Sequence, residues 1–300
     1  MRCFVLLAAV SVASAAIDMD VRQALSRGDL PGAERMLRDY RAKLGVTPEM
    51  LDALSWIGRA QLLSNSWDQA EATAKQTLDL SGAELKKRRL DSDPHLAAAV
   101  GAAIEVEAQV LASRGQRNQA VAYLRKELAV YANTSIAPRI QKNINLLGLE
   151  GRPAPELHSE EYLGPQPPSL AKLRGKPVLL FFWAHWCGDC KADEAIVAQV
   201  RSLYANKGLV VIAPTQRYGY AARGEEASPA QELRYIDAVR HQFYRDLLDA
   251  SVPVSEANFK NYGASTTPTL VVIDRSGIVR SYHPGAMTLG ELRAAVEKAL

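Results

Sequence analysis

The feature that most constrains this chain is an apolar run that ends shortly before a pair of cysteines. Val178 to Trp183 is uninterrupted in its apolar character and follows the turn-forming residues Gly175-Lys176-Pro177. Such a run of β-branched and aromatic residues predicts a strand buried on both faces, as in a parallel or mixed sheet. The residues after the run are compatible with a helix, so Cys187 is predicted to lie where the strand ends and a helix begins.

The spacing of Cys187 and Cys190 suits disulfide chemistry. Backbone N–H groups at a helix N-terminus stabilise a thiolate, so Cys187 is the expected nucleophile, with Cys190 close enough to form a disulfide. A structural zinc site normally needs four ligands, and no second cysteine pair completes one. Lys191, in place of a histidine, excludes covalent haem attachment. The remaining alternative is a purely structural disulfide, although closing so short a loop would stabilise the chain little.

Three phrases together resemble a known family. The sequence Trp-Cys-Gly-Asp-Cys occupies 186–190, and two further matching phrases occupy 151–157 and 169–176. They resemble TlpA/ResA-like thioredoxin-fold thiol-disulfide oxidoreductases of the AhpC/TSA-redoxin superfamily, over roughly residues 152–300. The resemblance implies an α/β thioredoxin-like fold, with a mixed sheet of four or five strands flanked by helices. It also implies a redox-active disulfide between Cys187 and Cys190, with no other cofactor and no metal.

A further phrase, Thr266-Thr267-Pro268-Thr269, precedes a predicted strand over Leu270 to Ile273. The resemblance implies that Pro268 is cis, faces the cysteines and keeps a backbone N–H away from the sulfurs. The backbone of Thr267 is then expected to hydrogen-bond a bound peptide. The implied substrate-binding residues are Trp186, Thr267, Gly188 and Asp189.

The expected proton acceptor departs from the pattern of thioredoxins, which place a buried acid where this chain has Phe181. The TlpA/ResA-like branch instead carries a glutamate three residues after the second cysteine, and that position is Asp193. We therefore expect Asp193 to be the acid/base group, with Glu194 as the second candidate. A carboxylate one turn below a thiol can accept its proton. The alternative is an exposed helix carboxylate.

Two further residues are expected to tune the thiolate. Asp189 replaces the proline usual between the cysteines, and its negative charge is predicted to disfavour the thiolate and make the couple more reducing. His185 would act in the opposite direction when protonated, and the alternative is an exposed structural histidine.

The first residues have the composition of an export signal. Arg2 supplies a positive charge, Phe4 to Val12 is apolar, and Ala13-Ser14-Ala15 is a small-residue cleavage pattern. We therefore predict a signal peptide over 1–16 and a periplasmic or other extracytoplasmic location. No later segment has the length expected of a stable membrane span. The net charge of +3 is too small and dispersed to indicate nucleic-acid binding.

Residues 17–150 are predicted to be all-α, followed by the thioredoxin-like domain over 151–300. Ala, Leu, Gln, Glu and Arg dominate the first region, and its apolar residues recur at helical spacing. Three similar turns, each five residues before an alanine, lie at Gly28, Asn65 and Gly115. They resemble degenerate tetratricopeptide helix pairs, which stack on one another. Such a region would bind a protein partner or a peptide, or would pack or dimerise.

The predicted function is thiol-disulfide oxidoreduction in the cell envelope. The partners would be client protein disulfides or dithiols, together with an upstream thiol-disulfide reductant. One alternative is a peroxiredoxin-like peroxidase, because that branch shares Pro153-Ala154-Pro155, but residues 183–186 lack its expected Thr and Pro. The other is a non-catalytic helical adaptor with a passenger redox domain. Intact Cys187, Cys190 and Pro268 argue against that alternative.

Overall fold

The computed structural model describes residues 17–300. These separate into two compact units that divide between Val110 and Leu111, and each is described by itself. The predicted signal peptide and Cys3 lie outside the described residues. The domain division proposed at residues 150 and 151 stays a prediction.

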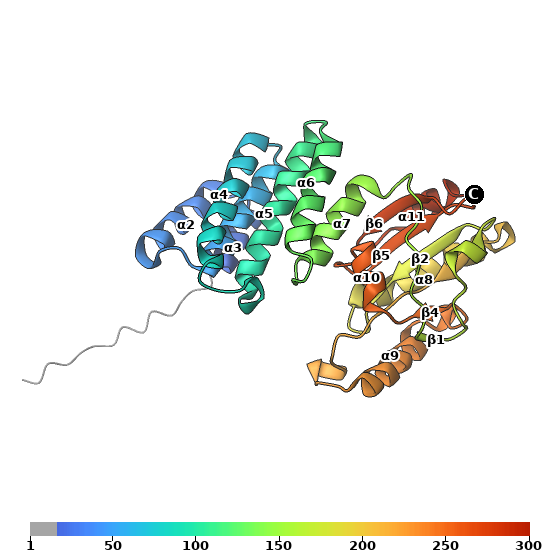
Figure 1. Ribbon diagram of the computed structural model, residues 1–300. Helices are drawn as coiled ribbons and strands as arrows, with labels where there is room; N and C mark the ends of the chain where they lie inside the picture. Colours follow the sequence, from blue (N-terminus) through green and yellow to red (C-terminus); the bar gives the residue numbers. More distant parts are fainter. Residues whose placement is uncertain (1–16) are drawn as a thin grey trace, which may run out of the picture. The chain divides into compact units, whose positions relative to one another are not determined.

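The first unit is built from antiparallel helices (Figure 1). Its helices are α1 (Ile17–Ser26), α2 (Leu30–Leu44), α3 (Pro48–Leu63), α4 (Trp67–Leu85) and α5 (Pro94–Ser113), with a 3-10 turn, η1 (Leu90–Ser92), before α5. Helix α1 packs on α2 and α3, and α3 packs on α4. Ala70 and Ala74 of α4 lie in one buried cluster with Ala103 of α5. These small side chains allow the helices to approach closely.

The three similar turns of the sequence adopt one backbone conformation. The φ angles of Gly28, Asn65 and Gly115 are 78°, 58° and 80°. In each turn the next residue donates its N–H to a carbonyl five residues earlier, which is a helix-ending bond that favours Gly or Asn. The alanines that follow, Ala33, Ala70 and Ala120, are fully buried. The turns are therefore structurally equivalent, while their assignment as tetratricopeptide repeats stays a prediction.

Within the described residues, α5 is long and apolar enough to cross a membrane by length and composition, so the expectation that no later segment reaches that length is wrong. Of its most apolar window, 61% is buried inside the protein. A buried core helix meets the same two criteria, and the burial of α5 fits that role.

The second unit contains the sheet and the helices around it. Its helices are α6 (Arg117–Val130), α7 (Ala137–Gly148), α8 (Gly188–Leu203), α9 (Pro229–Phe243), α10 (Glu256–Tyr262) and α11 (Leu289–Glu297). Its strands are β1 (Tyr162–Leu163), β2 (Val178–Phe182), β3 (Val210–Ile212), β4 (Val252–Pro253), β5 (Thr269–Ile273) and β6 (Val279–Pro284). The main sheet has the order β3-β2-β5-β6, with β2 parallel to β3 and antiparallel to β5, and β1 and β4 form a separate antiparallel pair. The predicted mixed sheet is confirmed.

Strand β2 is buried on both faces, as its sequence predicts. Leu179 and Phe181 belong to one core cluster, and Leu180 and Phe182 belong to the other, because alternate residues of a strand point to opposite faces. Helix α8 contributes to the first cluster, and α10 contributes to the second.

Helix α8 carries Val197 and Val200 inward, as its apolar spacing predicts. The same spacing wrongly predicts Ala195 and Leu203 as inward residues, since both are exposed. Leu203 is the last residue of the helix, where few neighbouring elements remain to cover a side chain.

Helix α7 is fixed against α10 by a close approach of backbones. Gly263 ends α10 with φ 58°, and a Cβ there would collide with the backbone of Lys142 in α7. The Asn145 side-chain amide donates to the carbonyl of Tyr262 at 2.8 Å. The middle of α7 is therefore held against the end of α10.

Candidate active site

The register of the sheet brings the two diagnostic phrases together. Strands β2 and β5 are antiparallel, and Phe182 pairs with Thr269. The residues after β2 and before β5 therefore meet at one edge. There the Thr267–Pro268 peptide bond is cis, as the resemblance implies, and Sγ of Cys187 lies 3.5 Å from the carbonyl oxygen of Thr267.

Cys187 is the N-cap residue of α8 and forms a disulfide with Cys190. Its Sγ accepts a hydrogen bond from the backbone N–H of Cys190 at 3.0 Å. A thiolate at this position would be stabilised by the same N–H and by the helix dipole. Cys187 is 3% exposed and Cys190 is fully buried, so attack is expected at Cys187.

The residues between and before the cysteines form the surface around them. Trp186 is 50% exposed, and Gly188 and Asp189 are also exposed. Pro268 is buried and Thr267 is half-buried. The predicted substrate-binding residues thus surround Cys187, although their roles remain predictions.

Asp193 is buried, and so is not the exposed helix carboxylate of the alternative interpretation. It is 6% exposed, and its Oδ2 finds no hydrogen-bond partner in the part of the chain that the structure describes. Burial raises its pKa, the backbone N–H of Met287 acts in the opposite direction, and the charge of Asp189 raises it further. Residues three apart on a helix are neighbours, with Cβ atoms about 5–6 Å apart, so Asp193 lies within reach of Cys190.

Glu194 is buried as well, but its carboxylate is already engaged. Its Oε1 accepts the backbone N–H of Asp246 at 2.9 Å, which anchors the 3-10 turn η5 (Arg245–Leu247) to α8. Burial raises its pKa, and the bond from Asp246 opposes that shift. This engagement favours Asp193 over Glu194 as the proton acceptor.

His185 differs from both of the sequence-based interpretations. It is 1% exposed, and burial lowers its pKa, although Glu232 acts in the opposite direction. The lowered pKa disfavours the protonated, activating form of His185, and its burial excludes the exposed histidine of the alternative interpretation. Its Nε2 lies 3.3 Å from the Glu232 carboxylate, which also accepts the backbone N–H groups of Tyr218 and Gly219.

Glu232 and Tyr218 were not found by sequence reasoning. Glu232 ties the active-site turn to the loop that follows β3, and Tyr218 in that loop packs edge-on against Trp186 with ring centroids 5.5 Å apart. These contacts join residues far apart in sequence. The only available signal was the position of Glu232 in the first turn of a helix with a strong capping box.

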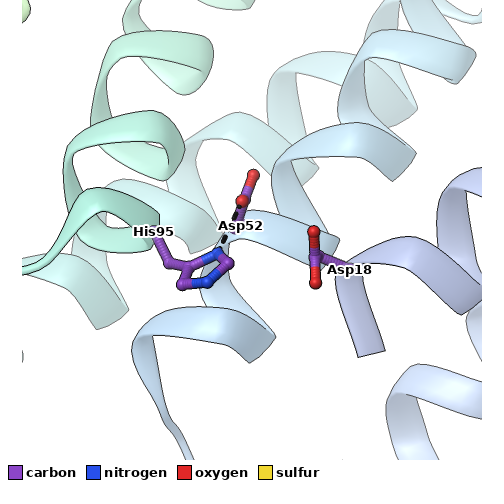
Figure 2. A group of neighbouring side chains, drawn as sticks. All are labelled: Asp18, Asp52 and His95. Atoms are coloured by element: carbon purple, nitrogen blue, oxygen red, sulfur yellow. Dashed lines mark hydrogen bonds and ion pairs between the residues drawn. The ribbon is translucent and has the colours of Figure 1, made fainter. Parts of the chain in front are cut away.

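A separate cluster in the first unit has residue types that can bind metal ions. Figure 2 shows Asp18 of α1, Asp52 of α3 and His95 of α5, whose potential ligand atoms lie within 4.8 Å of one another. However, Nδ1 of His95 is 3.0 Å from Asp52 Oδ2, and the Arg22 guanidinium lies 3.2 Å from Asp18 and 3.5 Å from Asp52. Arg22 and His95 already engage the oxygens of the two carboxylates. The cluster is therefore a network of ion pairs and hydrogen bonds that joins three helices.

Comparison with known proteins assigns the fold around the cysteines. The family model described as "Thioredoxin-like domain" matches residues 167–300. This part of the chain has a thioredoxin-like fold. The matched residues include the cysteines at the start of α8 and cis-Pro268 before β5.

Three similar proteins illustrate the match. The thioredoxin-like protein YneN of Bacillus subtilis is 27% identical over 151 residues, covering 49% of this chain and 79% of YneN. The thiol-disulfide oxidoreductase ResA of Oceanobacillus iheyensis is 29% identical over 127 residues, covering 41% and 57% of the two chains. A solved thiol:disulfide interchange protein from Chlorobium tepidum is 21% identical, covers 50% of this chain and 96% of its own, and has a TM-score of 0.40.

Proposed function

We propose that this protein is a thiol-disulfide oxidoreductase that reduces or exchanges disulfides of client polypeptides. The observation that carries the proposal is the position of Cys187. It caps α8, is bonded to Cys190 and faces cis-Pro268 and the Thr267 carbonyl. The similarity to proteins named as thiol-disulfide oxidoreductases supports the same chemistry.

The reaction begins from the reduced dithiol. The Cys187 thiolate attacks one sulfur of the client disulfide, forming a mixed disulfide and releasing the other client sulfur as a thiolate, which takes up a proton. Cys190 then loses its proton to Asp193 and attacks Sγ of Cys187. This closes the Cys187–Cys190 disulfide and releases the second client thiolate, which is protonated in turn. In total the client gains two electrons from the protein and two protons. One proton is released when Cys187 ionises, and the other leaves Cys190 through Asp193, which returns to its carboxylate form.

The cycle requires a thiol-disulfide partner that reduces the Cys187–Cys190 disulfide again. We place this cycle outside the cytoplasm, because the first residues have the pattern of an export signal and the described chain holds no cysteine besides the pair. We further propose that residues 17–150 form a helical partner-binding region and residues 151–300 the redox domain.

An insulin-reduction assay tests the proposal, with dithiothreitol as electron donor. Wild-type protein is expected to accelerate insulin precipitation, and Cys187→Ser is expected to lose this activity because the nucleophile is absent. A parallel assay follows peroxide consumption by the prereduced protein. Rapid peroxide consumption with no insulin reduction would instead support the peroxidase alternative.

A further inference from the structure

The turn that leads into Cys187 has two central residues with opposite environments. The backbone N–H of Cys187 donates to the carbonyl of Ala184 at 3.1 Å, which closes a turn around His185 and Trp186. Trp186 is 50% exposed, whereas His185 is 1% exposed. The side chain of His185 therefore anchors the inner side of the turn over 184–187, from which α8 begins.

Glu232, in the first turn of α9, lies against the imidazole of His185. The Nε2 atom is 3.3 Å from Oε1 of Glu232, and both side chains are 1% exposed. A buried carboxylate is costly unless hydrogen bonds satisfy it. Here Oε1 also accepts the backbone N–H of Tyr218 at 2.5 Å, and Oε2 accepts that of Gly219 at 2.9 Å. Both oxygens of the carboxylate act as acceptors, so the imidazole completes the set as a donor from Nε2.

Three tyrosine rings surround the same imidazole. Tyr218, Tyr220 and Tyr235 contact it edge-on, with ring centroids 5.5, 5.3 and 5.3 Å away. Edge-to-face packing of this kind is favourable. Tyr218 also packs edge-on against Trp186, the outer residue of the turn. The carboxylate of Glu232 therefore links the inner residue of the turn to the loop whose tyrosine packs against the outer one.

The residue before the turn is held by a separate set of contacts. The backbone N–H of Trp183 donates to the carbonyl of Pro214 at 3.1 Å, and its indole Nε1–H donates to that of Ala213 at 2.9 Å. The Thr215 hydroxyl donates to the carbonyl of Trp183 at 2.9 Å. Loss of the Glu232 contact would leave these bonds in place and loosen the turn that follows them.

We propose that Glu232 is a positioning residue of the disulfide-exchange site, which acts through His185 to hold the turn over 184–187 against the loop over 216–227. A thiolate must approach a disulfide sulfur in a defined direction, and misplacement by about 1 Å can slow a reaction about 100-fold. The direction in which Cys187 meets the client therefore depends on a carboxylate that does not touch the client. This inference rests on the proposed disulfide exchange and adds a residue that supports the same site.

The rate constant for reduction of a disulfide peptide tests the role of Glu232. Prereduced full-length protein is mixed with a synthetic peptide that carries one disulfide, at a temperature at which circular dichroism shows each variant to be folded. Glu232→Gln should lower the rate constant at least about tenfold, because an amide has one acceptor oxygen and its NH₂ group would face a backbone N–H. Glu225→Gln removes the same charge from an exposed position of the loop over 216–227 and should keep the wild-type rate constant.

Two substitutions of His185 separate the hydrogen bond from the packing of the ring. His185→Phe keeps an aromatic ring among the tyrosines but removes the Nε2–H donor. His185→Gln loses the ring but places an amide N–H near the position of Nε2. We expect His185→Phe to lower the rate constant about tenfold and His185→Gln to stay near the wild-type value.

The outcomes separate positioning from stability, and both from the proposed function. A lower melting temperature of Glu232→Gln with an unchanged rate constant would show a purely structural carboxylate and overturn the proposal. Equal rate constants for His185→Phe and His185→Gln would also overturn it, and this comparison decides if Glu232→Gln does not fold. No reduction of the peptide by wild-type protein would instead contradict the proposed function itself.

Discussion

The substitution Asp193→Asn should make the protein more stable and less active. The carboxyl group is 6% exposed, and its Oδ2 has no hydrogen-bond partner within residues 17–300. Its pKa is raised, mainly by burial, so ionisation is harder in the folded than in the unfolded protein. The native state therefore loses stability as pH rises from about 4, the unfolded pKa, through the folded pKa.

The size of the gain follows from this geometry. Each unit by which the folded pKa exceeds the unfolded pKa corresponds to about 1.4 kcal/mol. Burying a hydrogen-bond acceptor without a partner costs about 1–3 kcal/mol, and the cost is larger when the acceptor is charged. The neutral amide of the Asp193→Asn variant avoids the added cost of the charge. We expect Asp193→Asn to raise the free energy of unfolding by about 1–3 kcal/mol at pH 7. The gain should vanish below about pH 4, where the wild-type carboxyl is protonated in both states.

Activity should change in the opposite direction. General acid–base groups contribute about 10²–10⁴ in rate, so we expect exchange to slow at least about a hundredfold, most strongly between about pH 6 and 8. Urea unfolding of the oxidised protein and pH–rate profiles of the reduced protein measure the two effects. Glu194→Gln is the matched control, because Glu194 already accepts the Asp246 N–H, and its profile should keep the wild-type shape. A stability gain with an unchanged Asp193→Asn profile would refute the proton-acceptor role.

Three further substitutions test separate parts of the molecule. Asp189→Pro should lower the pKa of Cys187 by about one unit and raise the reduction potential by about 30 mV, as measured against glutathione; an unchanged potential would exclude the charge effect. His95→Gln should reduce the melting temperature more at pH 5.5 than at pH 8.5. Burial lowers the pKa of His95, but the hydrogen bond and charge of Asp52, with the charges of Asp18 and Glu49, raise it overall. The stabilisation is therefore complete below about pH 6.5 and is lost as pH rises through the raised pKa; equal losses would contradict this. Gly263→Ala should cost at least about 1–3 kcal/mol in urea unfolding, because φ is 58° and α7 lies against that position.

The sequence predicts those parts of the fold that depend on local signals. The apolar run over 178–183 marks the central strand, which ends at Phe182. The capping boxes at Ser228 and Thr288 mark the starts of α9 and α11, and both are present. Each of these features is encoded within a few neighbouring residues.

Features that depend on distant contacts could not be predicted. The contact between His185 and Glu232 spans 47 residues, so sequence alone suggested an exposed or protonated histidine. The packing of α7 on α10, where Gly263 meets Lys142, is likewise encoded by no local pattern. Burial of Asp193 likewise depends on the elements that cover α8, Met287 among them.

The most direct test of the account is mixed-disulfide trapping with two single-cysteine variants. Cys190→Ser retains the nucleophile and lacks the resolving thiol, so it should accumulate client proteins or peptides bonded through Cys187, as detected by non-reducing electrophoresis and mass spectrometry. Cys187→Ser retains only the fully buried Cys190 and should trap far fewer. Equal trapping by the two variants, or trapping by Cys187→Ser alone, would contradict the assignment of Cys187 as nucleophile and Cys190 as the resolving thiol.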